Sequence, residues 1–193
     1  MTSTTLAYSS SHVVGSLIES TRRHDGYTAE HSIRTSMVAS RIATTMGLAP
    51  GAVEQVRLAA LLHDIGKMGI PRSVLHKSGG LDQAEASLVR LHPILGATML
   101  STIAELRPLA PLVMHHHEHF DGNGYPNGLR GAEIPIESRI ILVADAFDAM
   151  TTDRHYSSAV TEDAAVAEML MWSGRQFDPM AIDALIHVRG ATL

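Results

Sequence analysis

The chain has 193 residues, 45% of them apolar, no cysteine and a formal net charge of −5. That length suits one domain with a hydrophobic core, and the missing cysteines exclude disulfides and thiolate metal sites. The acidic balance argues against a DNA or RNA polymer as partner, because such partners are bound through bulk positive charge. Apolar runs such as Leu58–Leu62 are far shorter than the about 20 residues of a membrane span, so we expect a cytoplasmic protein without a membrane segment.

Apolar residues at helical spacing run through most of the chain and predict an all-α fold. Residues 1–11 are rich in Ser and Thr and predict a disordered start, followed by a single domain over residues 12–193. Asp82 with Glu85 predicts a capping box, and Pro50 suits a first helical turn. The expected helices cover residues 13–23, 28–46, 50–63, 139–150 and 161–172. Further helices are expected to open at Asp82 and at Pro179, and Pro93, Pro108 and Pro111 predict helix starts or kinks.

Two glycine-rich segments interrupt the predicted helices. Gly66–Gly80 contains four glycines and one proline, and Gly122–Pro135 contains four glycines and two prolines. We expect both segments to be loops. Long loops inside a compact domain are usually functional.

Histidine is the residue type in excess, with 12 copies against one Trp, four Tyr and three Phe. Many imidazoles without thiols are typical of proteins that hold transition metals. His63 and Asp64 directly follow the apolar run Leu58–Leu62, where burial of two polar groups is costly unless something satisfies them. The pair predicts either a core imidazole bonded to a carboxylate or a metal centre, and by itself it does not decide between these two.

Five imidazoles and two carboxylates share such an apolar context on separate helical segments. Seven groups are too many for one ion, whose positions must also admit substrate, and they suit two ions. A tag remnant is the alternative origin of the run His115–His117, but tags are terminal and this run is internal. The seven candidates are His31, His63, Asp64, His92, His116, His117 and Asp145, whereas His12, His24, His76, His119, His155 and His187 lack the context and are expected at the surface.

Longer motifs surround these candidates. His31 with Arg34 forms H-x-x-R, His63–Lys67 reads H-D-I-G-K, and His116–Pro126 reads H-H-E-H-F-D-G-N-G-Y-P. These motifs resemble those of the HD-GYP domains, a subgroup of the HD phosphohydrolase superfamily, over about residues 25–185. The resemblance implies a compact multi-helix bundle in which two glycine-rich loops surround a central dinuclear metal site.

The resemblance also implies an activity, the hydrolysis of the second messenger cyclic di-GMP to linear pGpG and in some members onward to GMP. The seven candidates would hold two divalent ions, with Asp64 bridging them, and imidazole with carboxylate favours iron or manganese. Two such ions can activate a bridging water that attacks phosphorus. Some members hold a third ion through a glutamate at the position of Tyr27, and this departure predicts a two-metal site.

Asp64 and Lys67 are the candidate catalytic residues. Lys67 is one of only two lysines and lies four residues after His63. It could bind a phosphate oxygen or protonate the leaving 3′-oxygen, and the alternative is a solvated loop cation. The sequence leaves these roles open.

Four further positions match residues that contact substrate in the family. By resemblance, Tyr125 and Gly124 line the substrate pocket and Arg154 meets a phosphate or a guanine. Asp148 could contact guanine, orient a histidine or cap a neighbour. The family's usual R-P-Y-[RK] ends here in Ser157. The lost cation removes one phosphate contact and leaves open which cyclic dinucleotide is the substrate.

Two other classes of function stay open at this point. One is a non-catalytic module that binds a cyclic dinucleotide, or a diguanylate cyclase through the loop Asp121–Pro126, and only Tyr27 and Ser157 favour it. The other is hydrolysis of a different nucleotide, as elsewhere in the HD superfamily. A homodimer through the helix before His24 and Asp25 is a further expectation about partners.

Overall fold

The computed structural model describes residues 3–153 and 158–190, and it is helical throughout these ranges apart from turns and loops. No β-strand occurs in them, and a single isolated bridge joins Ser173 to Phe177. The predicted all-α class is confirmed. The helices are α1 (Ser3–His24), α2 (Gly26–Thr45), α3 (Pro50–Leu62), α4 (Arg72–Leu75), α5 (Gln83–Val89), α6 (His92–Ser101), α7 (Ala110–Met114), α8 (Ile136–Thr151), α9 (Glu162–Met171) and α10 (Pro179–Gly190), with 3-10 helices η1 (Ile65–Gly69), η2 (Arg107–Leu109) and η3 (Gly131–Glu133).

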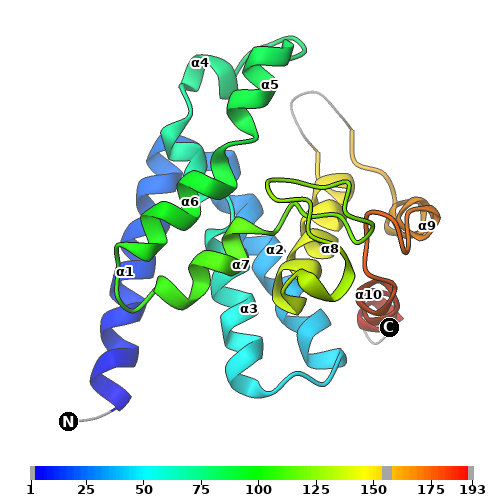
Figure 1. The fold of residues 1–193 in the computed structure, drawn as a ribbon, viewed down its shortest axis with the longest axis horizontal. Helices are drawn as coiled ribbons and strands as arrows, with labels where there is room; N and C mark the ends of the chain where they lie inside the picture. The colour runs from blue at the N-terminus through cyan, green and yellow to red at the C-terminus, as the bar shows by residue number, and fades with distance from the viewer. Residues whose placement is uncertain (1–2, 154–157, 191–193) are drawn as a thin grey trace.

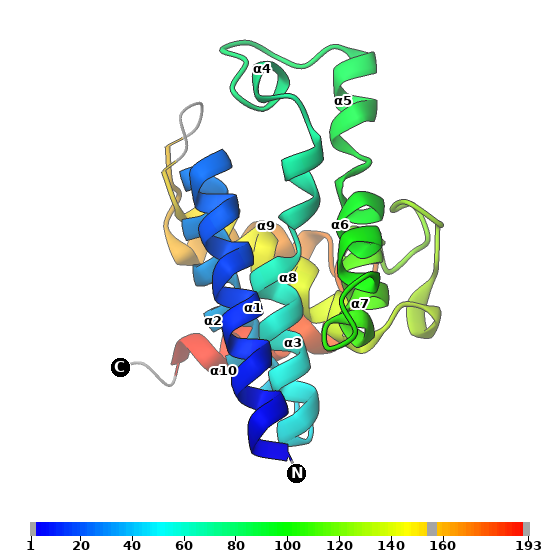
Figure 2. The same ribbon diagram turned by 90° about the vertical axis from the view of Figure 1, so that its left-hand side faces the viewer.

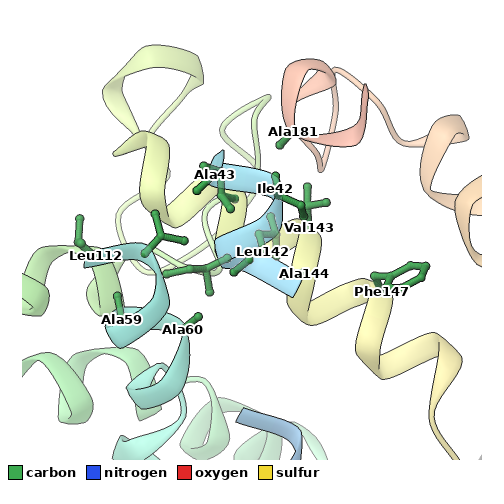
Figure 3. Packing of buried hydrophobic residues seen from close by; sticks show 14 of the residues in the cluster. Ile42, Ala43, Ala59, Ala60, Leu112, Leu142, Val143, Ala144, Phe147 and Ala181 are labelled. Atoms are coloured by element: carbon green, nitrogen blue, oxygen red, sulfur yellow. The ribbon is translucent and has the colours of Figure 1, made fainter. Parts of the chain in front are cut away.

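Helices α2, α3 and α8 pack against one another at the centre of the molecule, as Figure 1 and Figure 2 show. Helices α1 and α10 pack against α2, while α7 packs against α3 and α6 against α7. Fully buried Ala43, Ala59, Ala60 and Ala144 lie in this core, and Figure 3 shows them among larger side chains such as Ile42. Small side chains allow helix axes to approach closely, which brings together the ends that carry the polar residues.

Helix ends largely follow the sequence signals. Asp82 accepts a hydrogen bond from the backbone of Glu85, whose side chain accepts one from the backbone of Asp82, so the predicted capping box opens α5. Asp178 accepts a hydrogen bond from the backbone N–H of Met180 and caps α10. Helix α3 begins at Pro50 as predicted. Among the described helices, none is both long and apolar enough to cross a membrane.

The structure differs from the sequence-based expectation in two segments. Helix α1 begins at Ser3, inside the segment 1–11 that the composition predicts to be disordered. Extending a helix by further residues is much easier than nucleating one, so the packed part of α1 can propagate toward the N-terminus. The predicted loop Gly66–Gly80 contains η1 and α4, because hydrogen bonds from the N–H groups of Lys67 and Ile70 close 3-10 turns.

Helices α4 and α5 form an arm that projects from the bundle, as both Figure 1 and Figure 2 show. Neither helix contains a buried residue. An ion pair between Lys77 and Glu85, 2.5 Å long, ties the two sides of the arm together. The arm returns to the bundle at His92, the first residue of α6.

Candidate metal centre

Five histidines and two aspartates that are far apart in the sequence meet where α2, α3, α6, α7 and α8 approach one another. They form two groups of three residues, and within each group the ligand atoms all lie within 4.8 Å of one another. The first group is His92, His116 and His117, and the second is His31, His63 and Asp64. Asp145 adjoins the second group, with its Oδ1 2.9 Å from Nε2 of His31.

Backbone carbonyls orient three of these imidazoles. In His63, His92 and His116, Nδ1 lies 2.6 to 2.8 Å from the carbonyl oxygen three residues earlier. These carbonyls belong to the last turns of α3, α5 and α7, where no helical N–H is available to them. Because a carbonyl only accepts, Nδ1 carries the proton and Nε2 keeps a free electron pair directed at the centre.

The free electron pairs face one another, which fits a bound cation. Nε2 of His92 lies 3.2 Å from Nε2 of His116, and Nε2 of His63 has no hydrogen-bond partner in the described part of the chain. Burial lowers the pKa of His92 to about 4 and lowers that of His116 well below its usual value, so no proton lies between these two Nε2 atoms near neutral pH. The donor set therefore suits divalent metal ions.

Asp64 belongs to the second group and also faces the first. Its Oδ1 is 3.3 Å from Nε2 of His92 and its Oδ2 is 3.4 Å from Nε2 of His63. Burial alone would raise the pKa of Asp64, but the charge of Lys67 lowers it well below its usual value. An ionised carboxylate that faces both groups has the geometry of a bridging ligand.

Lys67 lies beside this carboxylate. The first turn of η1 follows Asp64 and brings Nζ of Lys67 to 2.6 Å from Oδ2 of Asp64. The Lys67 side chain is 26% exposed, so the ammonium lies at the edge of the centre, in contact with both the carboxylate and solvent. This ion pair favours a role at the centre over the alternative of a solvated loop cation.

Asp148 lies behind His31, on the side away from the other ligands. Its Oδ2 is 2.6 Å from Nδ1 of His31, and Arg34 donates to both of its oxygens at 2.7 and 3.0 Å. Burial lowers the pKa of His31, but hydrogen bonds with Asp145 and Asp148 outweigh it and raise that pKa to about 9. Because its two oxygens are engaged and its side chain is 5% exposed, the geometry of Asp148 favours the orientation of His31 over a contact with substrate.

Glu118 shapes the loop that follows the ligand pair, a role that the sequence analysis missed. The residue is 1% exposed, and its Oε1 and Oε2 accept hydrogen bonds from the backbone N–H groups of Asn127 and Leu129 at 2.7 and 3.1 Å. A carboxylate directly after His116 and His117 is the signal that could have revealed it. Glu118 holds the loop against the metal centre.

Gly124 packs against the backbone of residues 117–119, and Tyr125 contacts the side chain of His117. A Cβ at Gly124 would lie 2.1 Å from the backbone nitrogen of His119 and 2.5 Å from the carbonyl oxygen of His117. Gly124 is therefore required for backbone packing, and its predicted place beside substrate stays a prediction. The Tyr125 ring stacks on the His117 imidazole, with centroids 4.9 Å apart and planes 26° apart.

Gly66 performs a similar function between η1 and α6. A Cβ at Gly66 would lie 1.9 Å from the carbonyl oxygen of His92 and 2.5 Å from the backbone nitrogen of Gly96. Only glycine allows these backbones to approach so closely. This contact sets the position of His63 and Asp64 relative to His92.

The remaining candidates have varied surroundings. Arg154 and Ser157 lie outside the described residues. Tyr27 stacks on His31 with ring centroids 6.3 Å apart and planes 5° apart. His24 and His119 are partly buried, unlike the surface position predicted for them.

Residues 12–181 match the family model described as HD domain. The chain belongs to the HD domain family. Within it, the motifs that begin at His63 and end at Pro126 are those of the HD-GYP subgroup, as their resemblance predicted. The expected family is confirmed.

Curated relatives of this HD domain are named as phosphodiesterases of cyclic dinucleotides. The chain is 43% identical over 167 residues to the cyclic di-GMP phosphodiesterase response regulator RpfG of Xanthomonas campestris, covering 86% of this chain and 44% of that protein. It is 33% identical over 184 residues to 3′3′-cGAMP-specific phosphodiesterase 2 of Vibrio cholerae, covering 94% and 35%. The chain thus spans less than half the length of these relatives.

Solved structures support the fold. An HD-GYP-type protein from Bdellovibrio bacteriovorus, Bd1817, has a TM-score of 0.66 at 22% identity, over 83% of this chain and 51% of that one. The HD domain of the L. monocytogenes phosphodiesterase PgpH has a TM-score of 0.64 at 18% identity, over 91% and 97%. The arrangement of helices is therefore that of known HD domains.

Proposed function

We propose that this protein is a metal-dependent phosphodiesterase that hydrolyses cyclic di-GMP to linear pGpG, with GMP as the product of a second hydrolysis. The observation that carries the proposal is Asp64, an ionised carboxylate that faces both groups of ligand atoms and lies 2.6 Å from Lys67. Relatives named for cyclic di-GMP, among them the one that is 43% identical, favour this substrate.

The proposed metal set consists of two divalent ions, iron or manganese. His92, His116 and His117 would hold one, and His31, His63 and Asp145 the other, with Asp64 shared by both. When bound, such ions lower the pKa of water and neutralise phosphate charge. Their identity is proposed from the donors, since imidazole and carboxylate without thiolate suit iron and manganese.

The chain's own residues would bind and orient the substrate around the scissile phosphodiester. In the reaction, a water molecule releases a proton to solvent as its oxygen bonds to phosphorus, the bond from phosphorus to the 3′-oxygen breaks, and that oxygen takes up a proton. We assign the proton donor to Lys67, whose partly exposed ammonium stands at the edge of the centre. The Tyr125 ring, stacked on His117, would border the substrate.

The test is hydrolysis by anaerobically purified protein loaded with Fe²⁺ or Mn²⁺. We expect conversion of cyclic di-GMP to pGpG, followed by chromatography, and loss of that conversion in the variant Asp64→Ala. Cyclic di-GMP and 3′3′-cGAMP are compared because relatives are named for each. A loaded wild-type protein that leaves both intact would refute the proposal.

The competing function is a binding module without catalysis. It predicts that Asp64→Ala still binds cyclic di-GMP and that no product forms with the wild type. The intact ligand geometry favours the enzyme. Contacts with a diguanylate cyclase through the loop Asp121–Pro126, and with a second copy of the chain, stay predictions.

A further inference from the structure

One arginine stands beside the metal centre without a carboxylate partner in the described ranges. Arg90 is the C-cap residue of α5, and its guanidinium carbon lies 5.3 Å from the centre of the Tyr125 ring. That ring stacks on the imidazole of His117. A row of guanidinium, phenol and imidazole therefore leads from the solvent-exposed Arg90 to a proposed metal ligand.

The backbone of Arg90 is held in place relative to the centre. Its N–H donates to the carbonyl oxygen of Ala86 at 3.0 Å, and the N–H of Leu91 donates to that of Leu88 at 3.1 Å. Two residues later, His92 is buried among the ligands. The last turn of α5 thus holds the backbone of Arg90 two residues before that ligand.

Other cations near the centre are already neutralised by carboxylates. Arg34 is paired with Asp148, and Lys67 with Asp64. The interaction that the structure gives the Arg90 side chain is the contact with the Tyr125 ring. A cation over an aromatic face is held by the electrons of the ring, while its N–H groups stay available to an anion.

A cyclic dinucleotide has two phosphodiesters, of which one is cleaved at a time. We propose that Arg90 binds the other one, which is not being cleaved. The inference rests on the proposed function, in which one phosphodiester lies at the metal ions beside Lys67. The second phosphodiester of the ring must then lie away from the ions, toward the rim of the site. Arg90 offers this anion a planar pair of donors, the geometry that phosphate oxygens prefer.

The experiment compares substrates with one and with two phosphodiesters. Metal-loaded Arg90→Ala and Arg90→Lys are assayed with cyclic di-GMP and with bis(p-nitrophenyl) phosphate, which has a single phosphodiester. Arg107→Ala is the matched control, an exposed arginine beyond the far end of α6. Metal content is measured for every variant, so that any effect on the ions is separated from an effect on substrate.

We expect Arg90→Ala to raise KM for cyclic di-GMP roughly ten- to hundredfold. This is the loss of affinity that usually follows when one hydrogen bond to a charged group is removed. The kcat for cyclic di-GMP and the rate with bis(p-nitrophenyl) phosphate should stay unchanged. Arg90→Lys should lie between wild type and Arg90→Ala. The affinity of a non-hydrolysable phosphorothioate analogue of cyclic di-GMP, measured by calorimetry, should fall by the same factor as KM rises.

Two results would overturn the assignment of Arg90. One is an unchanged KM and an unchanged analogue affinity in Arg90→Ala. The other is an equal loss with both substrates, which would mean that Arg90 only supports the Tyr125 ring. Failure of the loaded wild type with both substrates would instead refute the proposed function, and analogue binding would then still test Arg90.

Discussion

Nδ1 of His31 lies 2.6 Å from Oδ2 of Asp148, and Arg34 binds the same carboxylate through both oxygens. Three residues from α2 and α8 thus form a relay behind one proposed ligand, in which His31 and Asp148 are buried and Arg34 is partly exposed. The relay fixes the His31 ring so that Nε2 faces Asp145. A metal site of this kind depends on groups that never touch the ion.

The first prediction concerns this relay. Asp148→Asn keeps the shape of the side chain but places an amide where Arg34 and His31 need a carboxylate. We expect the affinity for Mn²⁺ to fall about 10–100-fold, measured by calorimetric titration. Asp183→Asn, at an exposed position on α10, is the control and should bind as the wild type does. Equal affinity in Asp148→Asn would contradict an orienting role.

The second prediction concerns the backbone contact at Gly66. Gly66→Ala forces a methyl group to within 1.9 Å of the carbonyl oxygen of His92, so α6 and η1 must separate. We expect the free energy of unfolding to fall by about 1–3 kcal/mol in urea titrations. Gly79→Ala is the matched control, because no atom lies within 4 Å of a Cβ there. A similar stability for the two variants would argue against the close contact.

The third prediction concerns the loop held by Glu118. Glu118→Ala leaves the N–H groups of Asn127 and Leu129 without their carboxylate, at a cost of about 1–3 kcal/mol. We expect these two amides to exchange hydrogen faster, while metal content stays unchanged. Glu133→Ala, in the same loop but exposed, should leave both amides protected. Unchanged exchange in Glu118→Ala would show that other contacts hold the loop.

The fourth prediction concerns metal removal. Folding brings the Nε2 atoms of the ligand histidines together, whereas they are far apart in the unfolded chain. Metal ions therefore bind the native state preferentially and stabilise it. At a free Mn²⁺ concentration 100 times the Kd, the gain is about 2.7 kcal/mol. Thermal unfolding should show Tm rising with Mn²⁺ for the wild type. His116→Ala should greatly reduce that rise, whereas His187→Ala, exposed on α10, should keep it.

The seven ligand candidates could be found from the sequence because each combines a polar side chain with an apolar neighbourhood. His63 and Asp64 after Leu58–Leu62 show this pattern, and the structure places both in one ligand group. Burial is encoded locally by the periodicity of apolar residues. The helical class and most helix limits follow from the same local signal.

The supporting residues could not be assigned in the same way, because their roles arise from contacts across the fold. Asp148 lies 117 residues from His31, and the sequence leaves its partner open. Gly124 resembles a substrate-cradling glycine in sequence, and only the backbone of His117 and His119 against it reveals its packing role. The cation over the Tyr125 ring likewise depends on where α5 returns to the bundle.

At Gly66 and at Gly124, segments next to the centre contact each other through main-chain atoms alone. Main-chain contacts cannot adjust by changing rotamer, so they act as mechanical stops between the segments that carry the ligands. Substitutions in the surrounding apolar core, such as an exchange of Ile for Leu, can then be absorbed by side-chain repacking without moving those stops. The distances between the ligand-bearing segments can therefore stay constant while the apolar residues of the core change during evolution.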